Sequence, residues 1–299
     1  MIGAACEDTY AVSNNDDSTR LGPRSEIIPA TNQWGRCGSI YDADCNGTND
    51  HPAVGSYDQR LKVGESQISL AANPGATFLF ESWYLAREDI NIYNSMGTVV
   101  STQNWNSTNN TWSISASTYK LDSAIDRWVS PTAPPANAKN SELAVGEGHA
   151  RLAVKATDNG DGTWRYDYAL MNLDFARAVT QGAEPNLRVL SNKGFDRFSV
   201  PLPAGVVASA TRFSDGDVNA ANDWIVDTSG GRVTWTAGSQ TLDWGSLFAF
   251  SLTANSAPVA ADGNLRVAQA GSPAAFDLAT FAPAPVVSDV IFANGFDAP

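Results

Sequence analysis

Hydrophobic and polar positions alternate over much of this chain, which is the pattern of strands that bury one face. Residues 149–156 and 163–170 both alternate, and the second run places Trp164, Tyr166 and Tyr168 on one face. The turn between them, Asp158–Gly162, contains the glycines that a hairpin needs. Further strands are predicted at 77–85, 98–100, 111–115, 195–200, 206–213, 224–227, 232–236, 247–252 and 265–268.

A helical turn is plausible only at 122–128, where Asp122 could act as the N-cap. Short strands at intervals of roughly 8–12 residues, with almost no helix, predict an all-β fold of sandwiches or barrels. Pro and Ala dominate residues 130–141, a composition typical of a linker. We therefore expect two antiparallel β-sandwich-like modules. A loop-rich N-terminal segment and the first module occupy 1–140, the second module occupies 141–283, and 284–299 form a C-terminal tail.

Composition limits the classes of function. The 299 residues include 19 Lys and Arg and 32 Asp and Glu, so the net charge is −13. Nucleic-acid binding relies on clustered cations, so this charge argues against such a partner. Apolar runs such as Phe78–Phe80 are far shorter than the roughly 20 residues of a membrane span, so we expect no membrane-spanning segment.

The three cysteines indicate an oxidising compartment. Cys37 and Cys45 flank a short Asp-rich loop that a disulfide could close, which would stabilise the fold by roughly 2–3 kcal/mol. Two unrelated thiols are the alternative. Cys6 is then left over, and its partner would lie in another chain or in a removed upstream segment. We expect a secreted, extracellular protein.

The same Asp-rich loop has the ligand spacing of an EF-hand-type calcium loop, with Gly47 at the sixth position. Its twelfth position is Ala53, so the usual bidentate carboxylate is missing. A second loop, Asp215–Asp223, repeats the spacing without the glycine. In the alternative interpretation, Asp and Asn only form turns. The predicted Ca²⁺ ligands are Asp42, Asp44, Asn46, Thr48 and Asp50.

Catalytic motifs are sparse. The two histidines, His51 and His149, belong to no H-E-x-x-H pair, and no G-x-S-x-G elbow occurs. Paired carboxylates remain as weak catalytic candidates, with Glu81 in the strongest strand and Glu88 and Asp89 just beyond it. A solvated strand face is the alternative for Glu81.

Nine tryptophans are the remaining chemical signal. Six of them, including Trp112, occur in strand-like segments and are mostly expected in the sandwich cores. Trp34 and Trp105 lie in loops rich in Asn, Ser and Gly, where an indole has less core to join. Exposed aromatic rings can stack on sugars or dock a protein, so Trp34 and Trp105 are the predicted ligand-binding residues.

Several segments carry a resemblance to known proteins, including Cys6–Tyr10, Leu21–Glu26, Gly146–Asp158 and Trp164–Asn172. Over roughly residues 6–253, the chain resembles an uncharacterised family of secreted, β-rich bacterial proteins. It implies that the chain begins inside a longer precursor, which would account for Cys6. Residues 289–297 are similar to a C-terminal tail found on exported proteins of certain Gram-negative bacteria, which again implies export.

These features favour an exported, non-enzymatic β-sandwich protein of the cell surface or extracellular matrix, stabilised by Ca²⁺. Its partners would be other copies of itself, joined through edge strands, or an extracellular glycan. The alternatives are a secreted glycan-active hydrolase that uses paired carboxylates, or a carbohydrate-binding module.

Overall fold

The computed structural model describes residues 24–34, 43–46, 63–85, 91–183 and 186–286. The fold is mostly β with several antiparallel sheets, which confirms the all-β prediction. The chain forms two compact units. Unit 1 consists of Met1–Ala124 and Ala176–Asn192, and unit 2 of Ile125–Phe175 and Lys193–Pro299.

Unit 1 contains one three-stranded antiparallel sheet and two hairpins. The sheet has the order β3-β4-β5, and the hairpins are β1-β2 and β9-β10. The bounds are η2 Arg24–Glu26, β1 Ile27–Ile28, η3 Pro29–Thr31, β2 Gln33–Trp34, α1 Glu65–Ile68, β3 Phe78–Ser82, η4 Ile92–Asn94, β4 Gly97–Asn106, β5 Thr111–Lys120, β9 Arg177–Gln181 and β10 Arg188–Lys193.

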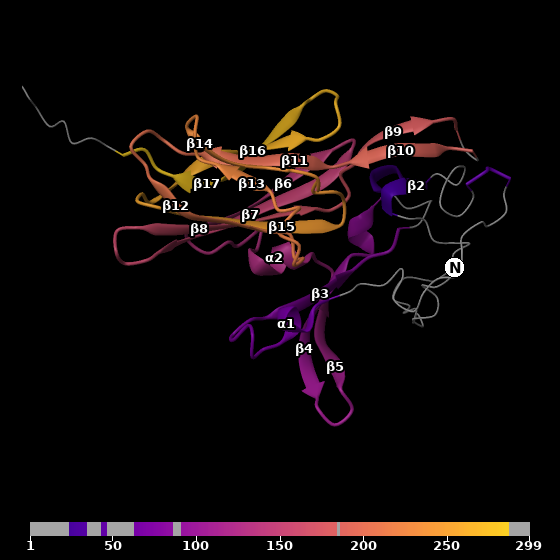
Figure 1. Ribbon diagram of the computed structural model, residues 1–299, viewed down its shortest axis with the longest axis horizontal. Coiled ribbons are helices and arrows are strands. Elements are labelled where there is room, and N and C mark those ends of the chain that lie inside the picture. The colour runs from indigo at the N-terminus through magenta and orange to yellow at the C-terminus, as the bar shows by residue number, and fades with distance from the viewer. Residues whose placement is uncertain (1–23, 35–42, 47–62, 86–90, 184–185, 287–299) are drawn as a thin grey trace, which may run out of the picture. The chain divides into compact units, whose positions relative to one another are not determined.

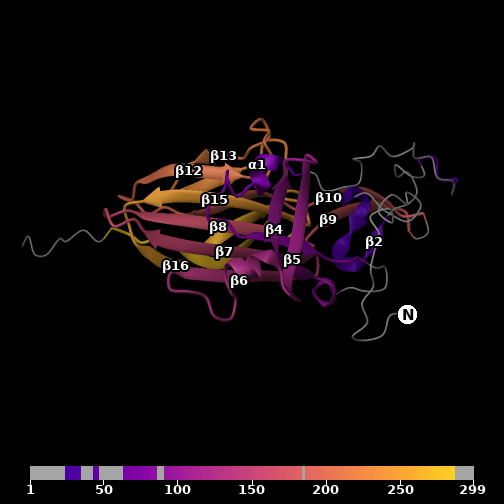
Figure 2. The ribbon, with the colours of Figure 1, turned by 90° about the horizontal axis from the view of Figure 1, so that it is seen from below.

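Unit 2 is a sandwich of two five-stranded sheets, with the orders β13-β14-β11-β16-β17 and β12-β15-β8-β7-β6. Figure 1 shows these sheets as two layers, and Figure 2 shows the strands of the second sheet side by side. The bounds are α2 Ala124–Trp128, β6 Ala138–Val145, β7 Gly148–Asp158, β8 Trp164–Asn172, β11 Phe195–Pro201, β12 Ala208–Ser214, β13 Ile225–Asp227, β14 Arg232–Thr236, β15 Ser246–Ala254, β16 Pro258–Val267 and β17 Ala275–Pro283.

Aromatic rings from both sheets fill the sandwich core. The Phe198 ring lies 5.5 Å from that of Tyr168 and 5.7 Å from that of Trp235, measured between centroids. Tyr166 and Tyr168 are both buried, as the alternation of β8 predicts. The hydroxyl of Tyr166 donates to the Ser256 carbonyl at 2.7 Å, and that of Tyr168 donates to the Phe281 carbonyl at 2.9 Å. Both hydroxyls therefore have a hydrogen-bond partner although the rings are buried.

The Pro-rich segment lies within unit 2, whereas the sequence suggested a boundary at 140/141. The compact units divide after Ala124. The side-chain amide of Asn140 donates to Asp126 at 2.9 Å and to the Val129 carbonyl at 2.8 Å. These bonds hold β6 against the end of α2, so the proline-containing stretch connects two packed elements of one unit.

Candidate functional site

Two tryptophans lie side by side on the β4-β5 hairpin of unit 1. Trp105 and Trp112 are directly opposite in the strand register, and their ring centroids are 5.4 Å apart. Trp105 is 43% exposed, and Trp112 is partly buried. Such a cross-strand pair presents a large apolar surface while the two rings hold each other in place.

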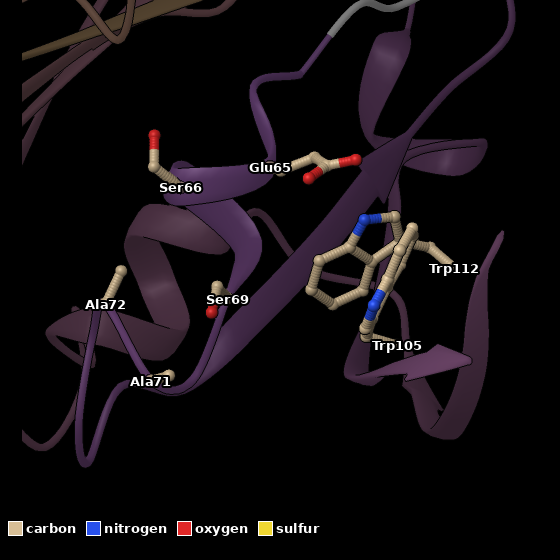
Figure 3. Close-up of a pocket in the computed structure, with 7 residues that line it drawn as sticks. All are labelled: Glu65, Ser66, Ser69, Ala71, Ala72, Trp105 and Trp112. Atoms are coloured by element: carbon tan, nitrogen blue, oxygen red, sulfur yellow. The ribbon is translucent and has the colours of Figure 1, made fainter. Parts of the chain in front are cut away.

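The indoles form one side of an open hollow of about 640 Å³. The other side comes from α1 and the residues after it. Figure 3 shows the Glu65 carboxylate pointing toward the two rings. The full lining consists of Glu65, Ser66, Ser69, Ala71, Ala72, Trp105 and Trp112.

Local hydrogen bonds fix the α1 side of the hollow. The Gln67 side chain accepts from the backbone N–H of Gly64 at 2.8 Å, which caps the start of α1. The Asn73 amide donates to the carbonyls of Ser66 at 2.8 Å and Ser69 at 3.0 Å. Hydrogen bonds within residues 64–73 therefore hold both ends of the segment that carries the polar lining.

The hollow combines apolar faces with hydrogen-bonding groups. Glu65 is exposed and supplies acceptors, and Ser66 and Ser69 supply hydroxyls that can donate and accept. Nε1 of Trp112 is buried and has no hydrogen-bond partner in the described part of the chain. A molecule with a flat apolar face and several hydroxyls matches this set of groups.

The sequence predicts Trp105 as a ligand-binding residue and gives no such role to Trp112 or to the α1 residues that line the hollow with it. It also predicts a loop at Trp105 and a core position for Trp112, whereas Trp105 lies on β4 and Trp112 lines the hollow from β5. A signal was present, because two tryptophans flank the Asn- and Thr-rich turn at 107–110. Trp34 pairs with Ile27 between β2 and β1, and its side chain lies outside the described part.

The carboxylate candidates lie elsewhere. Glu81 on β3 accepts a hydrogen bond from the backbone N–H of Ala124, the first residue of α2, and does not line the hollow. This bond engages the Glu81 carboxylate within unit 1. Glu88 and Asp89 lie outside the described residues.

The first predicted calcium loop is described only at residues 43–46. There the Asp44 carboxylate accepts from the backbone N–H of Asn46 at 3.2 Å and from its amide at 2.9 Å. Asp42, Thr48 and Asp50 lie outside the described residues. Among those that are described, no three His, Cys, Asp or Glu side chains form a group that could hold a metal ion.

The predicted Cys37–Cys45 bridge stays a prediction. Cys45 is disulfide-bonded. Cys6 and Cys37 both lie outside the described residues, so the pairing is not described.

In the second loop, the acidic side chains are engaged by neighbouring donors. The amide of Asn222 donates to Asp217 at 2.9 Å and to Asp215 at 3.4 Å. The hydrogen bond from Asn222 and one from the backbone of Asn219 lower the pKa of Asp217. This loop shows the turn-forming behaviour of Asp and Asn that was the alternative to calcium binding.

His149 and Asp174 form the closest described pair of a histidine and an acid. The ring Nδ1 of His149 lies 2.9 Å from the carboxylate of Asp174, which also accepts from the backbone N–H of His149. Asp174 is 1% exposed. The pair joins the start of β7 to the turn after β8. This is the arrangement expected for a histidine that has a structural role on a strand and whose ring has a hydrogen-bond partner.

Comparison with known proteins supplies no family. The chain matches no protein-family model, and no curated protein matches it. No helix in the described part of the chain is both long and apolar enough to cross a membrane.

Proposed function

We propose that the chain is an exported, non-enzymatic β-sandwich protein that contacts extracellular glycan through the Trp105–Trp112 hollow. The observation that carries this proposal is the pair of adjacent indoles, one of them 43% exposed, beside a hollow lined with hydroxyls and a carboxylate. Sugar rings have an apolar face that stacks on aromatic rings and hydroxyls that bond to polar side chains. The same chemistry underlies the predicted role of Trp105.

Binding without turnover fits the hollow better than hydrolysis does. Glycosidases need two carboxyl groups about 5–10 Å apart. Glu65 is the one acid among the described residues that line the hollow, and Glu81 is engaged by the backbone of Ala124. This supports a binding role in preference to the glycan-active hydrolase.

Self-association through strand edges has weaker support. A bulge interrupts the pairing of β12 with β15 between Ser209 and Arg212, and β13 at the edge of the other sheet has only three residues. Bulges and short edge strands protect sheets from pairing with other chains. Glycan is therefore our first choice of partner.

Calcium stabilisation of the loop that begins at Asp42 is a further part of the proposal. It rests on the spacing of the oxygen side chains between Asp42 and Asp50. The exposed carboxylate of Asp44, which lies in a tight turn, is compatible with this.

Titration with soluble oligosaccharides of glucose, N-acetylglucosamine and xylose, followed by calorimetry, tests the glycan site. We expect at least one of them to bind, and Trp105→Ala and Trp112→Ala to weaken that binding by about tenfold or more through loss of ring stacking. Phe80→Ala is the matched control, because Phe80 is a 51% exposed aromatic residue of the same sheet outside the hollow. Equal losses in all three variants would contradict a site at the hollow, and release of reducing ends that Glu65→Gln abolishes would favour the hydrolase.

A further inference from the structure

The outer face of one sandwich sheet carries a row of polar side chains across four strands. Phe198, Trp235, Leu265 and Leu278 of these strands point into the core. Because side chains alternate along a strand, their neighbours point outward. In the strand register Thr234, Ser199, Asn264 and Asp277 follow one another across β14, β11, β16 and β17.

The side chains of Arg232 and Arg197 contact this row of polar residues. Nε of Arg232 donates to the Ser199 hydroxyl at 2.9 Å, and its Nη2 donates to the Ser199 carbonyl at 3.0 Å. From the other side, Nη2 of Arg197 donates to Asn264 at 3.3 Å. Ser199 is only 3% exposed although it lies on the outer face, as expected if the guanidinium groups cover it.

The charges of these two arginines are not neutralised by an ion pair among the described residues. The neighbouring Arg266 differs, because it makes a two-pronged contact with Asp196 at 2.6 and 3.0 Å. Burial lowers the pKa of Arg232, the positive charge of Arg197 acts in the same direction, and the charge of Asp277 opposes both. Nε of Arg197 is buried and has no acceptor in the described part of unit 2.

We propose that Arg197 and Arg232 form a binding site for an oxyanion of an acidic polysaccharide, either a sulfate ester or a carboxylate. A guanidinium group has five N–H donors in a planar fork that matches such an oxyanion, and these two retain donors that no described group accepts. The partly exposed Thr234 lies in the same row of the register, where its hydroxyl could bind a sugar hydroxyl.

The small number of cations at the site favours this class of ligand over nucleic acid. Two arginines can hold a single oxyanion, but they are too few for the many phosphate contacts on which nucleic-acid affinity depends. The site is in unit 2, whereas the hollow is in unit 1, so this inference does not depend on the proposed function.

Three polymers with one backbone test the proposal: dextran sulfate, carboxymethyl dextran and neutral dextran, each titrated into the full chain at about 0.15 M salt. We expect one or both charged dextrans to bind, the neutral one to bind at least tenfold more weakly, and the double variant Arg197→Gln/Arg232→Gln to lose at least tenfold in affinity. The matched control is Arg188→Gln/Arg212→Gln, which removes the same charge at two exposed positions and should change affinity less than twofold.

The sulfated and carboxylated arms identify the oxyanion. Failure of both charged dextrans to bind would overturn the proposal, and so would equal losses in the two double variants, which would indicate general electrostatics. If the glutamine pair does not fold, Arg197→Lys/Arg232→Lys replaces it. Lysine keeps the charge but loses the planar fork, so we expect at least a fivefold loss, and unchanged affinity would contradict the site. Loss of neutral-glycan binding in Trp105→Ala would leave this result unaffected.

Discussion

A single buried carboxylate controls the charge of His149. The hydrogen bond that the His149 ring donates to Asp174 is the main cause that raises the pKa of His149, the charges of Asp174 and Glu142 add to it, and burial and Arg151 oppose it. The folded-state pKa therefore lies above the unfolded value of about 6.5. Protonation of His149 then stabilises the folded protein at pH values below about 6.5, and this contribution disappears as the pH rises through the raised pKa.

We predict that His149→Gln lowers the free energy of unfolding more at about pH 5.5 than at about pH 8.5. Glutamine can still donate one hydrogen bond to Asp174, but it gains no charge in acid. Denaturant unfolding of both proteins at constant ionic strength gives the two differences. A difference that is equal at both pH values, or larger at pH 8.5, would show that the imidazolium does not stabilise the fold.

At the scale of elements, the hydroxyl of Tyr168 connects the two sheets of the sandwich. Tyr168 is on β8 and its acceptor, the Phe281 carbonyl, is on β17 of the facing sheet. Burial raises the pKa of Tyr168 well above its usual value, so the hydroxyl keeps its proton and remains a donor. We predict that Tyr168→Phe lowers the free energy of unfolding by about 1 kcal/mol, because it removes a hydrogen bond between the two sheets.

Chemical denaturation measures this effect, with Tyr119→Phe as the control. Tyr119 is 62% exposed, so the change should stay within about 0.5 kcal/mol. Equal stability of Tyr168→Phe and the unmodified protein would mean that the sheets are held by apolar packing alone.

The sequence predicted those strands whose pattern is set by their own residues. β7 and β8 alternate strictly because one face of each packs in the core, and both were predicted. β6 was not predicted, because it begins within the Pro-rich stretch and owes its place to pairing with β7 and to the contacts of Asn140. The Trp105–Trp112 hollow was half predicted, because exposure of one ring is visible in the sequence whereas its approach to α1 depends on the folded chain.

At the scale of the whole molecule, the calcium proposal predicts a change in thermal stability. An extracellular-type loop binds at roughly 10⁻⁴–10⁻³ M, so millimolar Ca²⁺ should add about 1 kcal/mol, or about 2 °C in Tm. Thermal melts in Ca²⁺ and in excess chelator measure this shift. Asp44→Asn should reduce it, whereas Asp161→Asn, in the exposed turn between β7 and β8, should not. Identical melts in both buffers would contradict a stabilising calcium site.

The β9-β10 hairpin also bears on how the protein is made. It follows β8 in the chain but belongs to unit 1, where the Asn192 amide donates to the carbonyls of Arg24 and Ile27, both at 2.7 Å. During synthesis, therefore, the N-terminal unit cannot be completed until residue 192 has left the ribosome, after three strands of the other unit (β6, β7 and β8) have emerged. A gene shortened to residues 1–124 would encode a chain without Asn192, the donor to the carbonyls of Arg24 and Ile27. A single cut therefore cannot separate the two units into two intact proteins.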